Sequence, residues 1–124
     1  MIKKITAISP FIAGDETLLR ELLHPENDRV NLPFSLAHAM LLPGKSSLPH
    51  RLVKSSEVYF FFSGEGTIYL EEETFSVSAG DTFLVPPDVL QHVRNDGAQN
   101  LEFLCIVSPP WQADDEIVVN TEVG

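Results

Sequence analysis

Cysteine is almost absent from the sequence, which contains Cys105 and no other thiol. A single cysteine cannot form an internal disulfide, so a disulfide-stabilised scaffold is excluded and a reducing, cytoplasmic location is expected. Long hydrophobic runs are also missing, and none approaches the length of a transmembrane helix. Lys3 and Lys4 precede a mildly apolar segment, but Ser9 and Pro10 interrupt it too early for a secretory signal. We therefore expect a cytoplasmic protein without a membrane partner.

Positive charge is scarce as well, with 8 lysines and arginines against 18 acidic residues and a net charge of −10. Nucleic acids and anionic membranes both require a positive patch, so neither is an expected partner. The apolar content of 44% and the charged content of 21% are ordinary for a globular protein. A chain of 124 residues without an internal linker or repeat predicts one domain, residues 1–124.

Turn residues recur every few positions and separate short runs of β-forming residues. The predicted strands are residues 34–42, the run that ends at Gly64, and residues 67–70, 74–78, 82–85, 89–94 and 101–107. Residues 15–24 are ambiguous: the leucine spacing and Asp15 as a cap favour a helix, but ten residues between Gly14 and Pro25 also suit a strand. About seven or eight short strands with frequent turns predict an all-β sandwich or barrel.

One stretch, residues 50–64 (HRLVKSSEVYFFFSG), combines a histidine and a carboxylate with a strand expected to be buried. Glu57 begins a run rich in valine, tyrosine and phenylalanine. Burying that carboxylate costs several kcal/mol unless a cation or hydrogen-bond donor compensates it. A metal ion shared with His50 is one such compensation, and pairing with Arg51, Lys54 or nearby serines is another.

Two groups of residues lie at spacings that resemble the two motifs of the cupin family. The first group is Gly44, His50, Leu52, Glu57 and Gly64, and the second is Gly80, Pro86 and Asn95. Fifteen residues, 65–79, separate them, which is the short spacing of compact single-domain cupins. The resemblance implies an all-β double-stranded β-helix, or jelly roll, with core motifs in 44–95, a barrel over about 34–107 and short terminal extensions. It also implies a homodimer and a metal or small ligand inside the barrel.

The sequence departs from the family pattern at two of the usual histidine ligands. Leu52 stands where the second histidine is expected, and the third falls on Gln91, next to His92. Neighbouring side chains in a strand point to opposite faces, so we expect Gln91 to face the interior unless a bulge exchanges it with His92.

The resulting hypothesis is a divalent transition metal (Mn, Zn, Ni or Fe) bound by His50, Glu57 and Gln91, with His92 or His38 as substitute ligands. A pocket for a small polar metabolite would be lined by Tyr59, Phe61, Phe103 and Leu52.

Three functions follow from this hypothesis. A metal-dependent isomerase or oxygenase would use the metal to polarise a carbonyl or activate water. A non-catalytic module would bind a sugar or small acid in the same pocket. A protein with a vestigial, filled barrel would serve only in assembly with a partner.

Overall fold

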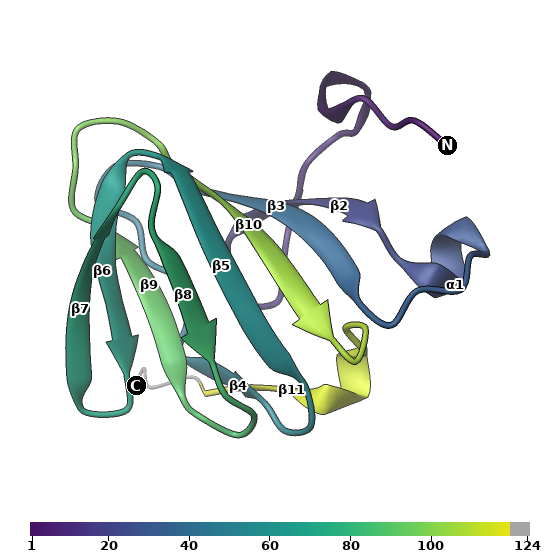
Figure 1. The fold of residues 1–124 in the computed structure, drawn as a ribbon. Helices are drawn as coiled ribbons and strands as arrows, with labels where there is room; N and C mark the ends of the chain where they lie inside the picture. Colours follow the sequence, from purple (N-terminus) through teal and green to yellow (C-terminus); the bar gives the residue numbers. More distant parts are fainter. Residues whose placement is uncertain (120–124) are drawn as a thin grey trace.

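The computed structural model describes residues 1–119 and contains two antiparallel β-sheets that face each other (Figure 1). The six-stranded sheet has the order β1 (Phe11–Ile12), β2 (Leu18–Leu23), β3 (Ser35–Leu41), β10 (Leu101–Ser108), β5 (Ser56–Ser63) and β8 (Thr82–Val85). The five-stranded sheet has the order β11 (Glu116–Val118), β4 (His50–Leu52), β9 (Gln91–Asn95), β6 (Glu65–Leu70) and β7 (Glu73–Ser78). Short helical turns are η1 (Ile5–Ala7), α1 (Pro25–Asp28) and η2 (Ala113–Asp115). The predicted all-β jelly roll is confirmed.

Alternation along the strands places one set of side chains between the two sheets. In β10 every second residue is buried, including Phe103 and Cys105, and in β5 the buried residues include Tyr59 and Phe61. The ring centroid of Phe103 lies 4.9 Å from that of Phe61 and 5.1 Å from that of Tyr59. Rings at these separations gain favourable edge and face contacts beyond the burial of their area. The aromatic run predicted to be a buried strand therefore supplies the centre of the core.

One end of the barrel is closed by Asn95, whose side chain is completely buried. Its Nδ2 donates to the carbonyl oxygens of Leu41 and Gln99, both at 2.8 Å, and its Oδ1 accepts from the Gly97 amide at 2.9 Å. Gly64 lies at the same end with φ +86°, and a Cβ there would be 2.6 Å from the Asn100 carbonyl oxygen. Only glycine fits that position, so the closed end is fixed by both the turn and the amide.

The helix favoured by the local sequence of residues 15–24 is wrong. Residues Leu18–Leu23 form β2, which pairs antiparallel with β3 through Leu18 opposite Met40 and Arg20 opposite His38. An edge position beside β3 gives the β2 backbone hydrogen-bond partners and half-buries its leucines. This pairing overrides the weak local preference for a helix.

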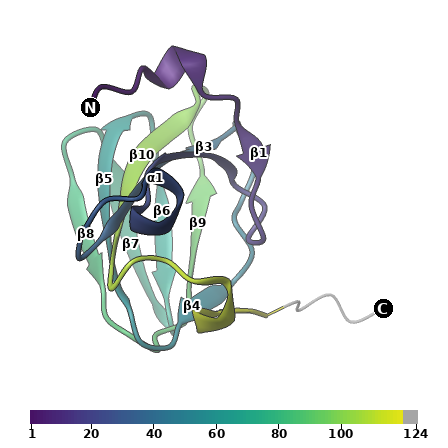
Figure 2. The ribbon, with the colours of Figure 1, turned by 90° about the vertical axis from the view of Figure 1, so that its right-hand side faces the viewer.

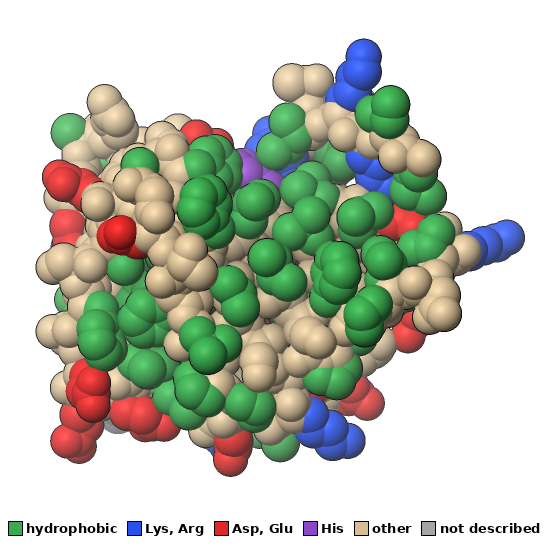
Figure 3. Space-filling model, viewed as in Figure 1, with side chains coloured by type: hydrophobic (Ala, Val, Ile, Leu, Met, Phe, Trp, Pro, Cys, Tyr) green, Lys and Arg blue, Asp and Glu red, His purple; other side chains and the backbone are tan. Residues whose placement is uncertain are grey.

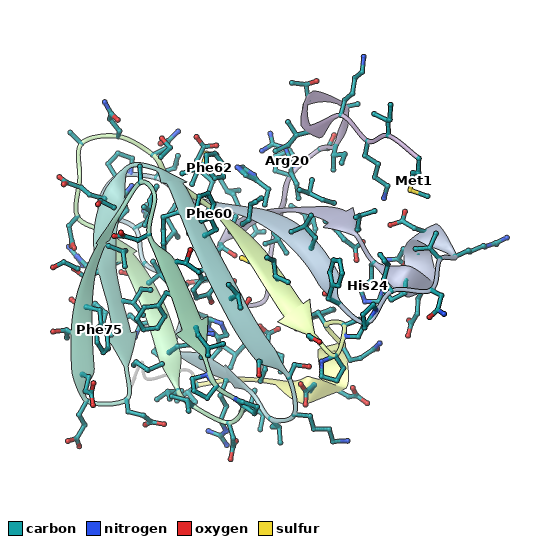
Figure 4. All side chains as sticks on the ribbon, in the orientation of Figure 1. Met1, Arg20, His24, Phe60, Phe62 and Phe75 are labelled. Atoms are coloured by element: carbon teal, nitrogen blue, oxygen red, sulfur yellow. The ribbon has the colours of Figure 1, made fainter. Side chains whose placement is uncertain are left out.

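The outer face of the six-stranded sheet carries exposed hydrophobic side chains (Figure 3). Phe60 is 38% exposed, Phe62 43% and Leu84 58%. Figure 4 shows Phe60 and Phe62 on β5, and the ring centroid of Phe62 lies 5.7 Å from that of His38. The N-terminal segment projects away from the barrel, and the Arg20 guanidinium holds it by donating to the Ile8 carbonyl at 2.8 Å.

No helix within residues 1–119 has both the length and the apolar character needed to cross a membrane.

Candidate functional site

A cavity of about 270 Å³ opens between the sheets at the end opposite Asn95. It is bordered by the β1–β2 loop, by β4 and β11, and by the inner residues of β5 and β10. In Figure 2 the yellow segment that contains η2 lies next to β4, in agreement with the pairing of β11 with β4. Two segments far apart in the chain therefore meet at this mouth.

His50 lies at the start of β4 and is 2% exposed. It is opposite Gln91 of β9 on one side and Val118 of β11 on the other. Its Nδ1 is 2.8 Å from the Leu48 carbonyl oxygen, which can only accept, so Nδ1 carries the hydrogen. The other ring nitrogen, Nε2, is 3.6 Å from Asp15 Oδ2, which is longer than a hydrogen bond.

Asp15 lies in the loop between β1 and β2, where Thr17 fixes its orientation. Asp15 Oδ1 accepts from the Thr17 amide at 3.1 Å and from Thr17 Oγ1 at 2.7 Å. The backbone carbonyl of Asp15 also accepts from the Leu48 amide at 2.7 Å, which ties the loop to the segment before His50. With Oδ1 engaged, Oδ2 remains to face the imidazole.

Glu116 is the first residue of β11 and pairs with Leu52 of β4. The preceding Asp115 anchors this segment, because its carboxylate accepts from the backbone amides of Lys54 at 2.8 Å and Ser55 at 3.2 Å. Burial, and then the neighbouring Asp15 carboxylate, raise the pKa of Glu116. One donor atom from each of Asp15, His50 and Glu116 lies within 4.8 Å of the others.

A second polar group lies deeper in the barrel. Glu57 Oε1 is 2.8 Å from Gln91 Nε2 and 3.0 Å from the Tyr59 hydroxyl, which is itself 2.6 Å from Gln91 Oε1. Burial raises the pKa of Glu57, and the charge of His50, followed by the Gln91 and Tyr59 hydrogen bonds, only partly opposes that effect. Burial, and then the Glu57 charge, raise the pKa of Tyr59 far above its usual range, so Tyr59 is a protonated donor.

The structure separates the residues predicted as metal ligands or substitute ligands into four places. His50 reaches the acidic pair Asp15 and Glu116, whereas Glu57 and Gln91 bond to each other and Glu57 is not part of the three-residue donor group. Gln91 faces the interior and is 1% exposed, and the neighbouring His92 stacks on Tyr69 at 4.3 Å.

His38 lies on the other face of its sheet, with Nε2 3.0 Å from Glu102. Of the predicted pocket residues, Leu52, Tyr59 and Phe103 line the cavity, but Phe61 packs in the core without reaching it.

Asp15 and Glu116 were not predicted as site residues. Asp15 appears in the sequence as a cap for an ambiguous segment, and Glu116 ends an acidic run that suits a solvated tail. Neither position has a spacing that connects it to His50, because their proximity depends on how the two flanking segments fold against β4. The sequence contains no local signal for this contact.

The Cupin domain family model matches residues 37–107, more than half of the chain. This chain is a cupin. The resemblance seen in the two motifs is thereby confirmed, and the barrel predicted over about 34–107 overlaps the matched region.

A relative of this cupin in Methanocaldococcus jannaschii, the uncharacterized protein MJ1618, is 37% identical over 108 residues, which are 87% of this chain and 86% of the relative. Among solved structures, the nucleoside dehydratase Pac13 of Streptomyces superposes with a TM-score of 0.79 at 22% identity, over 97% of this chain and 91% of that one. A Thermotoga maritima protein described as a predicted oxalate decarboxylase gives 0.77 at 23% identity, over 87% and 98%. At these identities the two structures establish the fold alone.

The donor atoms of this cupin fit a divalent metal. Two carboxylates and one imidazole are ligands that Mn, Fe, Ni and Zn accept, and three protein ligands leave open positions for water or another molecule. The Leu48 carbonyl orients His50 and the Thr17 hydroxyl orients Asp15, as outer-shell groups do around metal ligands.

Proposed function

We propose that this cupin binds a divalent transition metal through Asp15, His50 and Glu116, and uses it to bind and activate a small polar molecule in the adjacent cavity. One observation carries the proposal: the three side chains bring acceptor atoms within 4.8 Å of one another. With its hydrogen on Nδ1, a neutral His50 presents a lone pair to Asp15 across 3.6 Å. A cation between these atoms converts their repulsion into attraction.

The repulsion between the two carboxylates, Asp15 and Glu116, is also large enough to matter. Two ionised carboxylates at the upper limit of 4.8 Å repel by roughly 3.5 kcal/mol at an effective dielectric constant of about 20, before further screening by solvent. The pKa of Glu116 is raised first by burial and then by this repulsion from Asp15, since both disfavour its ionised form. Mn, Fe, Ni or Zn would neutralise the pair, and such an ion supplies Lewis-acid polarisation or an activated water.

The remaining residues of the cavity suit the binding of a small molecule. Leu52 and Phe103 provide apolar walls that exclude water, while Glu57 and Tyr59 form a hydrogen-bonding wall that Gln91 holds in place from behind. A cavity of this kind also argues against a filled barrel that serves only in assembly. Metal ligation by Glu57 and Gln91 stays a prediction, because a ligand role would require both side chains to leave their mutual hydrogen bond.

Elemental analysis of protein purified without chelator or histidine tag, followed by titration with Mn²⁺, Fe²⁺, Ni²⁺ and Zn²⁺, tests the metal proposal. We expect near-stoichiometric binding that Asp15→Asn and Glu116→Gln each weaken by at least tenfold. Asp114→Asn and Glu73→Gln are matched controls, since both carboxylates are exposed. Equal metal binding in the parent and the site variants, or no binding of any of the four metals, would refute the proposal. Loss of metal in Glu57→Gln alone would instead move the site to Glu57.

The second candidate is a metal-free binding module. The 3.6 Å separation of His50 Nε2 and Asp15 Oδ2 also suits an ion pair, in which a proton on Nε2 takes the place of the metal. In that case, ligands would raise the melting temperature by the same amount with and without chelator. Ligand stabilisation that disappears after chelation favours the metal centre.

A further inference from the structure

We infer that the cavity selects an organic cation, a small molecule with a protonated amine beside an apolar group, and rejects carboxylates and phosphates. This deepens the proposed function by naming the class of molecule that the cavity takes, and it rests on that proposal only in using the same cavity. Among the described residues that line the cavity, four are acidic (Asp15, Glu21, Glu57 and Glu116), and none is lysine or arginine.

The nearest arginines are engaged elsewhere. Arg51 follows His50 in β4 but pairs with Asp88 on the outside, with Nε 3.2 Å from Oδ1. Arg20 of β2 donates to the Ile8 carbonyl and lies beside His38 on the outer face. An anionic ligand would therefore meet four acidic side chains without a lysine or arginine to compensate them, whereas a cation would be attracted by all four.

Glu57 provides a specific position for the cationic nitrogen. Its side chain is 8% exposed, and its Oε1 accepts from both Gln91 and Tyr59. No residue among 1–119 donates a hydrogen bond to Oε2 of Glu57. Every fully enclosed side-chain oxygen in this range has a hydrogen-bond partner, so Oε2 is not enclosed and opens to the cavity that Glu57 lines. An ammonium group bound there would form a charge-assisted hydrogen bond in a site with little competing water.

The walls of the cavity suit the rest of such a molecule. Tyr59, Phe103 and Trp111 all line it, and aromatic faces attract cations as well as apolar groups. A metal at the mouth would offer open positions that a carboxylate can fill, so the amine preference belongs to the deeper part of the cavity. A divalent ion balances the charges of Asp15 and Glu116 but leaves the Glu57 carboxylate to favour a cation there.

Three probes that share one ring test this inference on protein treated with chelator: benzylamine, benzyl alcohol and benzoate, titrated at neutral pH and followed by NMR and by the melting temperature. We expect benzylamine to bind about tenfold or more tightly than benzyl alcohol, the gain typical of a charge-assisted hydrogen bond, and benzoate to bind least. Benzoate binding equal to or tighter than that of benzylamine would overturn the inference, and so would an absence of measurable benzylamine binding.

The position of the nitrogen is tested with Glu57→Gln, which keeps the shape of the side chain and removes its charge. We expect this variant to lose the preference for benzylamine over benzyl alcohol, while Glu73→Gln keeps it. An unchanged preference in Glu57→Gln would refute the assigned position.

The metal titration is run on the same proteins so that the two proposals fail separately. Amine selectivity without metal binding would refute only the metal centre. Metal binding without amine selectivity would refute only the ligand class.

Discussion

Replacing Thr17 with valine is expected to weaken divalent-metal binding by about tenfold without removing a metal ligand. The Thr17 hydroxyl donates to Asp15 Oδ1 at 2.7 Å, and the Thr17 amide donates to the same oxygen at 3.1 Å. Loss of an outer-shell hydrogen bond costs about 10- to 100-fold in metal affinity. Because the hydrogen bond from the backbone amide of residue 17 survives in Thr17→Val, we expect the lower end of this range. A tenfold loss of affinity corresponds to about 1.4 kcal/mol of binding free energy.

Competition titration with a fluorescent chelator gives the dissociation constant for Mn²⁺ or Zn²⁺, and a melting curve confirms that the variant is folded at the assay temperature. Thr67→Val is a matched control, since it also removes a hydrogen bond from threonine to aspartate, here to Asp96 on the other sheet and away from the cavity. Unchanged affinity in Thr17→Val, together with a clear loss in Asp15→Asn, would show that Thr17 does not orient the ligand.

Three further predictions concern stability and assembly. Because burial raises the pKa of Glu57 and Glu116 above the ordinary value of 4.5, each of these carboxyls keeps its proton to a higher pH in the folded metal-free protein than in the unfolded chain, so their contribution to the free energy of unfolding falls as pH rises above about 4.5. Urea denaturation from about pH 5 to 8 should show that the free energy of unfolding falls less steeply with pH in Glu57→Gln than in the parent protein. An identical slope in the two proteins would contradict the raised pKa of Glu57. Phe61→Ala should reduce the free energy of unfolding by about 3–5 kcal/mol, whereas Phe60→Ala, at an exposed position, should cost much less; similar losses would contradict the assigned core. The homodimer predicted from the family resemblance should use the outer face of the six-stranded sheet, so Phe62→Lys should give a monomer by light scattering while Ile117→Lys on the other sheet should not.

The barrel could be predicted from the sequence because its signals are local. Alternating side chains in 101–107 and 82–85 mark strands whose inner residues meet in the core, and Gly64 marks a turn where no side chain fits. Residues 15–24 could not be assigned in this way. The spacing of their leucines is compatible with both a helix and a strand. The choice between the two depends on pairing with β3, which comes later in the chain.

The site was predictable only in part for the same reason. His50 and Glu57 stand at family spacings on two strands of the barrel, so their inward direction follows from the pattern. Asp15 and Glu116 reach His50 through loop and edge contacts made by Thr17 and Asp115, and these contacts have no fixed spacing in the sequence. Their role depends on tertiary structure alone.

Two of the three proposed ligands, Asp15 and Glu116, lie outside residues 37–107, the part of the chain that the family shares. In the proposed metal site the shared barrel therefore contributes a single imidazole, and the flanking segments contribute the two carboxylates beside it, whereas the proposed ligand position at Glu57 belongs to the barrel itself. Related proteins with superimposable barrels can differ in their chemistry through a change in one loop before the barrel and one short strand after it. Grafting these two segments between cupins should transfer the choice of metal while the scaffold stays the same.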